Sequence, residues 1–150
     1  MDRSSDQTAK TASKMIELPT QRQIIRPWIV SEVENRWVTA VRRFAPEMMP
    51  RPLILSIVPA PIPKARAMLA GIGKAVVLWE VRRESLAACC DSLAAVAISS
   101  PQVLQLLAVS GLSDRERLML SEFRCAAMIR QPEDLPSLSR MIHGYFASTR

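Results

Sequence analysis

Short apolar runs alternate with helix-like segments five times between residues 26 and 148, and this alternation constrains the fold more than any other feature of the sequence. The strand-like runs are PWIVSE, RPLILSIV, KAVVLWEV, VLQLLAVSG and CAAMIRQP. Stretches such as AVVL and LQLLAV are apolar without a break, which is typical of parallel strands buried on both faces. Parallel strands need crossover connections, which are usually helices. The sequence therefore predicts an α/β fold with a five-stranded parallel sheet, doubly wound in the order 2-1-3-4-5.

The segments between these runs have apolar residues at helical spacing. In the segment after the first run, one apolar stripe is predicted at spacings of three or four residues, formed by Val33, Trp37, Val41 and Phe44. The last segment, residues 133–148, has a similar stripe. Ser113 and Glu116 fit a capping box, in which each side chain accepts a hydrogen bond from the other residue's free amide. These patterns predict helices between the strands.

The chain has the length and composition of one soluble globular domain, with 150 residues, 49% of them hydrophobic and 23% charged. Residues 1–24 are polar and without sustained periodicity, which predicts a flexible N-terminal tail and leaves residues 25–150 for the α/β domain. No apolar run approaches the roughly 18 to 20 residues needed to cross a bilayer. The N-terminus also lacks the apolar core of a secretory signal. We therefore expect a cytoplasmic protein without a membrane partner.

The formal net charge of +6 raises the question of nucleic-acid binding, because Lys and Arg bind phosphates. The basic residues are spread along the chain, however, with no Lys/Arg block, no RNA-binding aromatic motif and no zinc-finger spacing. DNA binding through basic helices is therefore a hypothesis that the pattern does not favour.

No motif indicates a metal, a cofactor or a catalytic group. Cys89, Cys90 and Cys125 lack the spacing of metal ligands and are interpreted as reduced thiols. The single histidine, His143, cannot form a multi-histidine metal site or a standard triad by itself. The GIGK sequence at residues 71–74 lies between a predicted helix and a strand and lacks the spacing of a phosphate-binding loop. The predictions are therefore no metal site, no cofactor and no enzymatic activity.

The last two strand-like runs resemble those of a bacterial response-regulator receiver domain. Receivers end their fourth strand in Thr or Ser followed by a small residue, and Ser110 and Gly111 stand at this place. Their fifth strand ends in Lys-Pro, where this chain has Gln131 and Pro132. The resemblance covers about residues 26–148 and implies the receiver fold. Gln131, however, cannot supply the positive charge of the family's lysine.

The acidic positions of the family are altered as well. Receivers hold Mg²⁺ with acidic residues after the first strand and accept phosphate on an aspartate after the third, where this chain has Glu80. Glutamate is one methylene longer, while Mg²⁺ and in-line phosphoryl transfer demand close geometry and a compensating cation. The resemblance thus implies a degenerate receiver pocket without phosphotransfer, formed by Ser31, Glu32, Glu34, Glu80, Ser110, Gln131 and Pro132. Within it Glu80 either mimics a phosphorylated aspartate by pairing with Gln131 and Ser110, or bonds to Arg82 or to helix amides.

Three functions follow as hypotheses. The first is a non-catalytic receiver-like signalling or scaffold domain that contacts a protein partner or a second copy of itself. Receivers commonly use the surface of the fourth helix, fifth strand and fifth helix, which here includes Arg115, Arg117, Arg124, Arg130, Arg140, His143 and Tyr145. The second is a phosphate- or nucleotide-binding domain whose crevice is lined by Ser31, Glu32, Glu80, Arg82, Arg83, Ser110 and Gln131. The third is a DNA-binding accessory protein.

Overall fold

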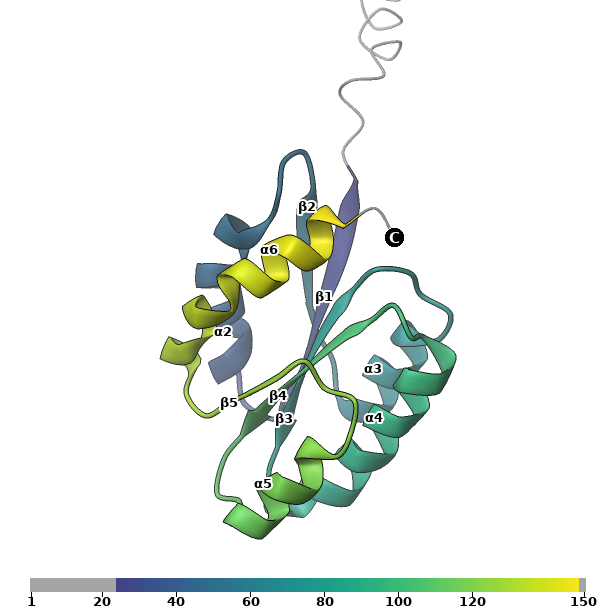
Figure 1. Ribbon diagram of the computed structural model, residues 1–150, viewed down its shortest axis with the longest axis vertical. Coiled ribbons are helices and arrows are strands. Elements are labelled where there is room, and N and C mark those ends of the chain that lie inside the picture. The colour runs from purple at the N-terminus through teal and green to yellow at the C-terminus, as the bar shows by residue number, and fades with distance from the viewer. Residues whose placement is uncertain (1–23, 149–150) are drawn as a thin grey trace, which may run out of the picture.

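Five strands form one parallel sheet in the order β2-β1-β3-β4-β5 in the computed structural model, which describes residues 24–148 (Figure 1). The strands are β1 (Ile25–Ser31), β2 (Ile54–Pro59), β3 (Val76–Val81), β4 (Leu104–Val109) and β5 (Ala127–Ile129). Each neighbouring pair is parallel. The predicted fold class and strand order are therefore confirmed. The predicted flexible tail lies outside the described residues, apart from Ile24.

Helices cover both faces of the sheet (Figure 1). They are α2 (Arg36–Phe44), α3 (Ile62–Leu69), α4 (Leu86–Ser99), α5 (Asp114–Ser121) and α6 (Ser139–Ala147), with short 3₁₀ segments at Ala45–Met48, Arg83–Ser85 and Pro132–Leu138. On one face, α2 and α6 enclose a core that contains Trp28 and Trp37. On the other face, α3, α4 and α5 pack over Trp79 and Leu107. All six residues of β3 are buried, as expected for a central parallel strand.

Two predicted helices begin later than their apolar patterns indicate. Val33 is 83% exposed and precedes α2, so its place in the first predicted stripe is wrong. The spacing of Val33 suits a helix, but the chain enters the helical conformation only at Arg36. Residues 132–138 form a 3₁₀ segment instead of the first turns of an α-helix. Pro136 lies within that segment and has no amide hydrogen for an α-helical bond.

The parallel register brings the carboxyl ends of the central strands to one edge of the sheet. Ser31 at the end of β1 pairs with Trp79, and Val81 at the end of β3 pairs with Val109. Polar residues near these strand ends therefore come together, although they are far apart in the sequence. Ligands favour this edge in open α/β sheets.

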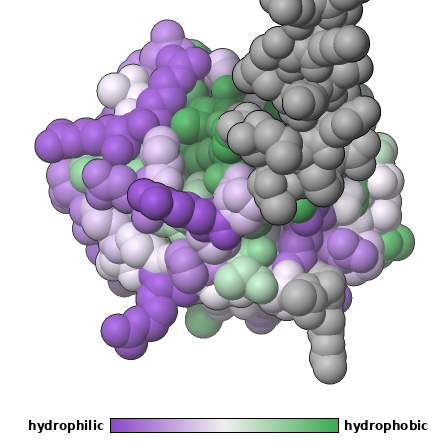
Figure 2. All heavy atoms as spheres, turned by 90° about the horizontal axis from the view of Figure 1, so that it is seen from above, coloured by the Kyte–Doolittle hydropathy of each residue, from purple (hydrophilic) through white to green (hydrophobic). Residues whose placement is uncertain are grey.

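The opposite edge carries the amino ends of the strands. Figure 2 looks onto this edge and shows a hydrophobic area bordered by hydrophilic surface. Ile25 and Ile54, which pair at the start of β1 and β2, are 63% and 38% exposed. None of the helices between residues 24 and 148 has both the length and the apolar character that a membrane crossing requires.

Candidate functional site

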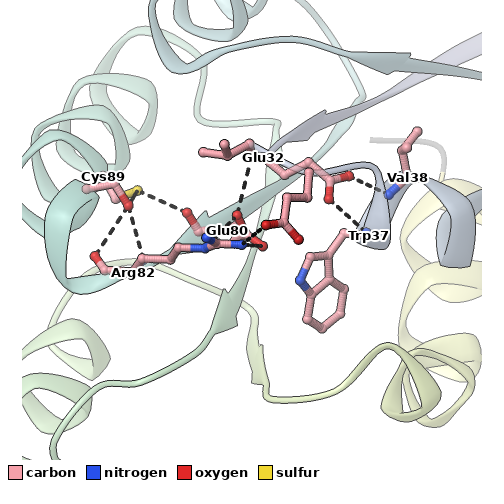
Figure 3. Close-up of polar contacts among 9 residues, drawn as sticks. Glu32, Trp37, Val38, Glu80, Arg82 and Cys89 are labelled. Carbon is pink, nitrogen blue, oxygen red and sulfur yellow. Dashed lines mark hydrogen bonds and ion pairs between the residues drawn. The ribbon is translucent and has the colours of Figure 1, made fainter.

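Glu80 is a buried carboxylate at the carboxyl edge of the sheet, and its side chain is 3% exposed. Its Oε1 lies 3.2 Å from Arg82 Nε, and its Oε2 lies 3.4 Å from Arg82 Nη2 (Figure 3). The backbone N–H of Val33 also donates to Oε1, over 3.4 Å. Of the contacts predicted for Glu80, the bond to Arg82 is present. Among residues 24–148, no hydrogen bond joins Glu80 to Ser110 or Gln131, and these two residues line another pocket.

Glu32 acts as the cap of α2 in this structure. Its Oε1 accepts a hydrogen bond from the N–H of Trp37 over 2.8 Å, and its Oε2 accepts one from Val38 over 2.6 Å (Figure 3). Asn35, which precedes the helix, makes no side-chain cap bond. Burial raises the pKa of Glu32, and the charge of Glu80 adds to this rise, whereas the hydrogen bonds from the helix amides lower the pKa. Both oxygens of Glu32 are therefore engaged within the chain.

The other predicted pocket residues differ widely in their surroundings. Ser31 is 2% exposed, and its hydroxyl has no hydrogen-bond partner within the described residues. The side chain of Glu34 is 69% exposed, and its carboxylate lies 3.9 Å from Arg82. Pro132 is buried at the start of its 3₁₀ segment. Across residues 24–148, no group of three or more His, Cys, Asp or Glu side chains could hold a metal ion.

The carboxyl edge holds two separate pockets where the sequence predicted one. The first has a volume of about 410 Å³ and is lined by Ser31, Glu32, Val33, Pro61, Ile62, Pro63, Glu80, Arg82, Glu84 and Ser85. The second has a volume of about 270 Å³ and is lined by Arg36, Val109, Ser110, Gly111, Leu112, Arg117, Arg130 and Gln131. They share no lining residue. Of the predicted acidic positions, Glu32 and Glu80 thus line the first pocket and Glu34 lines neither, whereas Ser110 and Gln131 line the second.

Cys89 lies on α4 beneath the first pocket. Its Sγ is 3.7 Å from the backbone oxygen of Glu80, to which the thiol donates (Figure 3). Burial raises the pKa of Cys89 to about 11. A thiol with this pKa is protonated at neutral pH, which agrees with its interpretation as a reduced thiol.

The predicted partner face spans both sides of the β5 edge, because α5 and α6 cover opposite faces of the sheet. Arg115 on α5 is exposed, as are Arg140 and His143 on α6. Tyr145 is half-buried, and its hydroxyl donates to the backbone oxygen of Ala75 and accepts from its N–H, both over 3.0 Å. Through these hydrogen bonds Tyr145 connects α6 to the backbone just before β3, at the amino ends of the strands.

Comparisons with known proteins give a fold and no family. Neither a protein-family model nor a curated protein matches the sequence. A solved structure described as a CheY-like protein (tadZ) from Pseudomonas aeruginosa PAO1 is similar, with a TM-score of 0.60 and 14% identity over 79% of this chain and 94% of that chain. A putative CpaE2 pilus assembly protein from Sinorhizobium meliloti 1021 has a TM-score of 0.58 and 12% identity over 77% of this chain and 98% of its own. The chain has a receiver-like fold. The resemblance proposed from the last two strands is confirmed at this level.

Two features of this receiver-like domain were missed by the sequence analysis. Arg36, at the start of α2, lines the second pocket together with two arginines that follow in the chain. No local pattern could reveal this, because the fold alone brings these residues together. The other feature is an exposed stripe on α5 that contains Leu118 and Met119. A signal for it existed in the sequence, since Leu118 and Met119 directly follow four charged residues, 114–117, in the same helix.

Proposed function

We propose that this chain is a non-catalytic receiver-like signalling or scaffold domain that is not phosphorylated and acts by protein contact, specifically by binding a second copy of itself. The contacts of Glu80, which is buried, and of Glu32, which is partly exposed, support the first half of this proposal. Glu80 is paired with Arg82, and both oxygens of Glu32 bind helix amides. Phosphoryl transfer needs a free nucleophile, metal ligands and a compensating cation, and Gln131 is uncharged.

A stripe on α5 carries the second half of the proposal. The stripe consists of Arg115, Leu118, Met119 and Glu122, which follow each other at helical spacing on one side of the helix. Leu118 is 68% and Met119 39% exposed. The four residues line one surface depression together with Leu86 and Glu116. Adjacent exposed apolar side chains rimmed by charges are typical of contact surfaces.

The order of charges along the stripe favours a second copy as the occupant. Leu118 stands near the middle of α5, with Arg115 towards one end and Glu122 beyond the other. In a two-fold arrangement with antiparallel α5 helices, Leu118 packs on Leu118 of the second copy. Arg115 then faces Glu122 of that copy, and the reverse pair forms as well. Such a self-complementary patch is what a two-fold interface requires.

One of the two structural neighbours is named a putative pilus assembly protein. An assembly or scaffold role for this chain belongs to the same broad class of function as that name.

Sedimentation equilibrium over a range of protein concentrations tests the self-association. Because burying a leucine is worth about 1.5–3 kcal/mol, L118D should weaken the dimer at least tenfold. The matched control is I98D, since Ile98 is 84% exposed on α4 and lies outside the stripe. R115E and E122R should each weaken the dimer, whereas the double variant R115E/E122R should restore it. A wild-type chain that stays monomeric at millimolar concentration contradicts the proposal, as does equal weakening by I98D.

The absence of phosphorylation is tested separately by incubating the chain with acetyl phosphate and Mg²⁺. Intact-protein mass spectrometry should show no added phosphoryl group. A phosphoryl group located on Glu80 would overturn this part of the proposal.

A further inference from the structure

The second pocket collects three arginine side chains from three different elements. Arg36 comes from the start of α2, Arg117 from α5, and Arg130 from the chain directly after β5. No Asp or Glu is among the residues that line this pocket. Neither Arg36 nor Arg130 pairs with a carboxylate belonging to residues 24–148. Like charges that face one cavity repel each other, so an anion placed among them is stabilised.

The arginines are partly held in position before any ligand binds. Arg117 Nη1 donates to the backbone oxygen of Leu112 over 2.7 Å, and Nη2 pairs with Asp114. A guanidinium group has five N–H donors, so Arg117 keeps others for a ligand. The side chain of Asp114 is 96% exposed and does not line the pocket. The guanidinium carbon of Arg36 lies 5.9 Å from the ring centroid of Trp37, within the range of a cation–π contact.

The backbone between β4 and α5 gives the pocket a polar wall. Gly111 has a φ of +69°, a conformation that strains residues with a side chain, and an added Cβ would meet no atom within 4 Å. The positive φ of this turn therefore favours glycine at position 111, whereas the space around it would admit a side chain. Ser110, directly before it, is exposed and adds a hydroxyl donor to the lining. The pocket thus lies at the carboxyl ends of β4 and β5, the edge where α/β sheets bind ligands.

We propose that this pocket binds a small anion that carries a diphosphate group. Arginine forks match phosphate oxygens in charge and in geometry. The volume of about 270 Å³ equals that of about nine waters at ~30 Å³ each, which suits a diphosphate and is too small for a nucleic-acid duplex. No aromatic side chain lines the pocket, so a nucleobase would find no stacking partner. The site contains Ser110 and Gln131 of the predicted receiver pocket but none of its acidic positions, and it shares no residue with the stripe on α5.

Isothermal titration calorimetry of the full chain with pyrophosphate, at constant ionic strength, tests the proposal. We expect saturable 1:1 binding that weakens as salt rises. R36Q and R130Q should each reduce the affinity about tenfold, because each removes a charge-assisted contact. The matched control is R140Q, which removes an exposed arginine on α6 outside the pocket and should leave the affinity unchanged. ADP should bind no more tightly than pyrophosphate, and orthophosphate should bind more weakly.

The proposal is wrong if millimolar pyrophosphate gives no saturable heat, or if R140Q weakens binding as much as R36Q and R130Q do. Binding of duplex DNA in place of pyrophosphate would also overturn it. Thermal unfolding without ligand checks that each variant is folded. L118D separates this proposal from self-association, because that variant should lose the dimer and still bind pyrophosphate like the wild type.

Discussion

Replacing Glu32 by alanine removes both side-chain oxygens that accept hydrogen bonds from the first turn of α2. The N–H groups of Trp37 and Val38 then lose their acceptor, and the negative charge beside the helix N-terminus is lost as well. Trp37 and Val38 are each 1% exposed, so water can replace the carboxylate only in part. The prediction is a less stable domain.

The size of the effect follows from the contacts that are lost. Loss of one capping side chain costs about 0.5–2 kcal/mol, and Glu32 serves two amides with an ionised group. Because Glu32 is partly exposed, the loss in the free energy of unfolding is smaller than that expected for two buried hydrogen bonds to a charged group. We expect E32A to lower the free energy of unfolding by about 2–3 kcal/mol, and E32Q, which keeps one acceptor oxygen, by about 1 kcal/mol.

Urea denaturation followed by circular dichroism measures these differences, and the m-value should stay unchanged. The control is E34A, because the side chain of Glu34 is 69% exposed and reaches Arg82 only at 3.9 Å. It should change the stability by less than about 0.5 kcal/mol. Equal stability of E32A and wild type refutes the capping role. A rise in wild-type melting temperature with Mg²⁺ that E32A abolishes would show that Glu32 is a metal ligand instead.

Two further substitutions test the buried polar contacts. Gln105 accepts a hydrogen bond from Trp79 Nε1 over 3.0 Å and donates one to the backbone oxygen of Leu93. Q105L should therefore lower the free energy of unfolding, measured by urea titration, by about 2 kcal/mol and alter tryptophan fluorescence. An unchanged urea midpoint would count against this contact. Y145F removes the hydroxyl bonds to Ala75 and should cost about 1–2 kcal/mol at pH 7. Burial raises the pKa of Tyr145, so its contribution is complete below the unfolded pKa and is lost as the pH rises through the folded one. The wild type should therefore lose stability relative to Y145F above pH ~10, and a constant difference would contradict this sign.

The sheet could be predicted because each of its strands is marked by a short apolar run of neighbouring residues in the sequence. Every residue of β3 is buried, and the apolar run over residues 75–79, which makes up most of this strand, is visible in the sequence without any tertiary knowledge. The start of α2 was mispredicted for the opposite reason. Val33 continues the helical spacing, whereas Glu32 decides where the helix begins by reaching forward to the amides of Trp37 and Val38. A residue that caps a helix from outside it does not belong to the helix's apolar pattern, so the spacing of apolar residues does not reveal it.

The position of the candidate site in the fold could be predicted from the sequence, but the contacts between its side chains could not. Parallel topology places the carboxyl ends of β1, β3 and β4 at one edge of the sheet, so Ser31, Glu80 and Ser110, at or directly after these ends, could be expected there. Whether Glu80 meets Arg82 or Gln131 depends on side-chain direction and on the loops, which spacing does not determine. The division of the edge into two pockets has the same origin.

The two pockets at this edge differ in how their charges are compensated, and this difference indicates where a ligand would act. In the first pocket the carboxylate of Glu80 already has the guanidinium of Arg82, so a ligand of either charge must compete with an existing pair. In the second pocket Arg36 and Arg130 have no carboxylate partner among residues 24–148. An anion there gains attraction without breaking an internal pair. Ligand binding by this receiver-like fold should therefore depend on the arginines that line the second pocket, and not on the acidic positions Glu32 and Glu80 of the first.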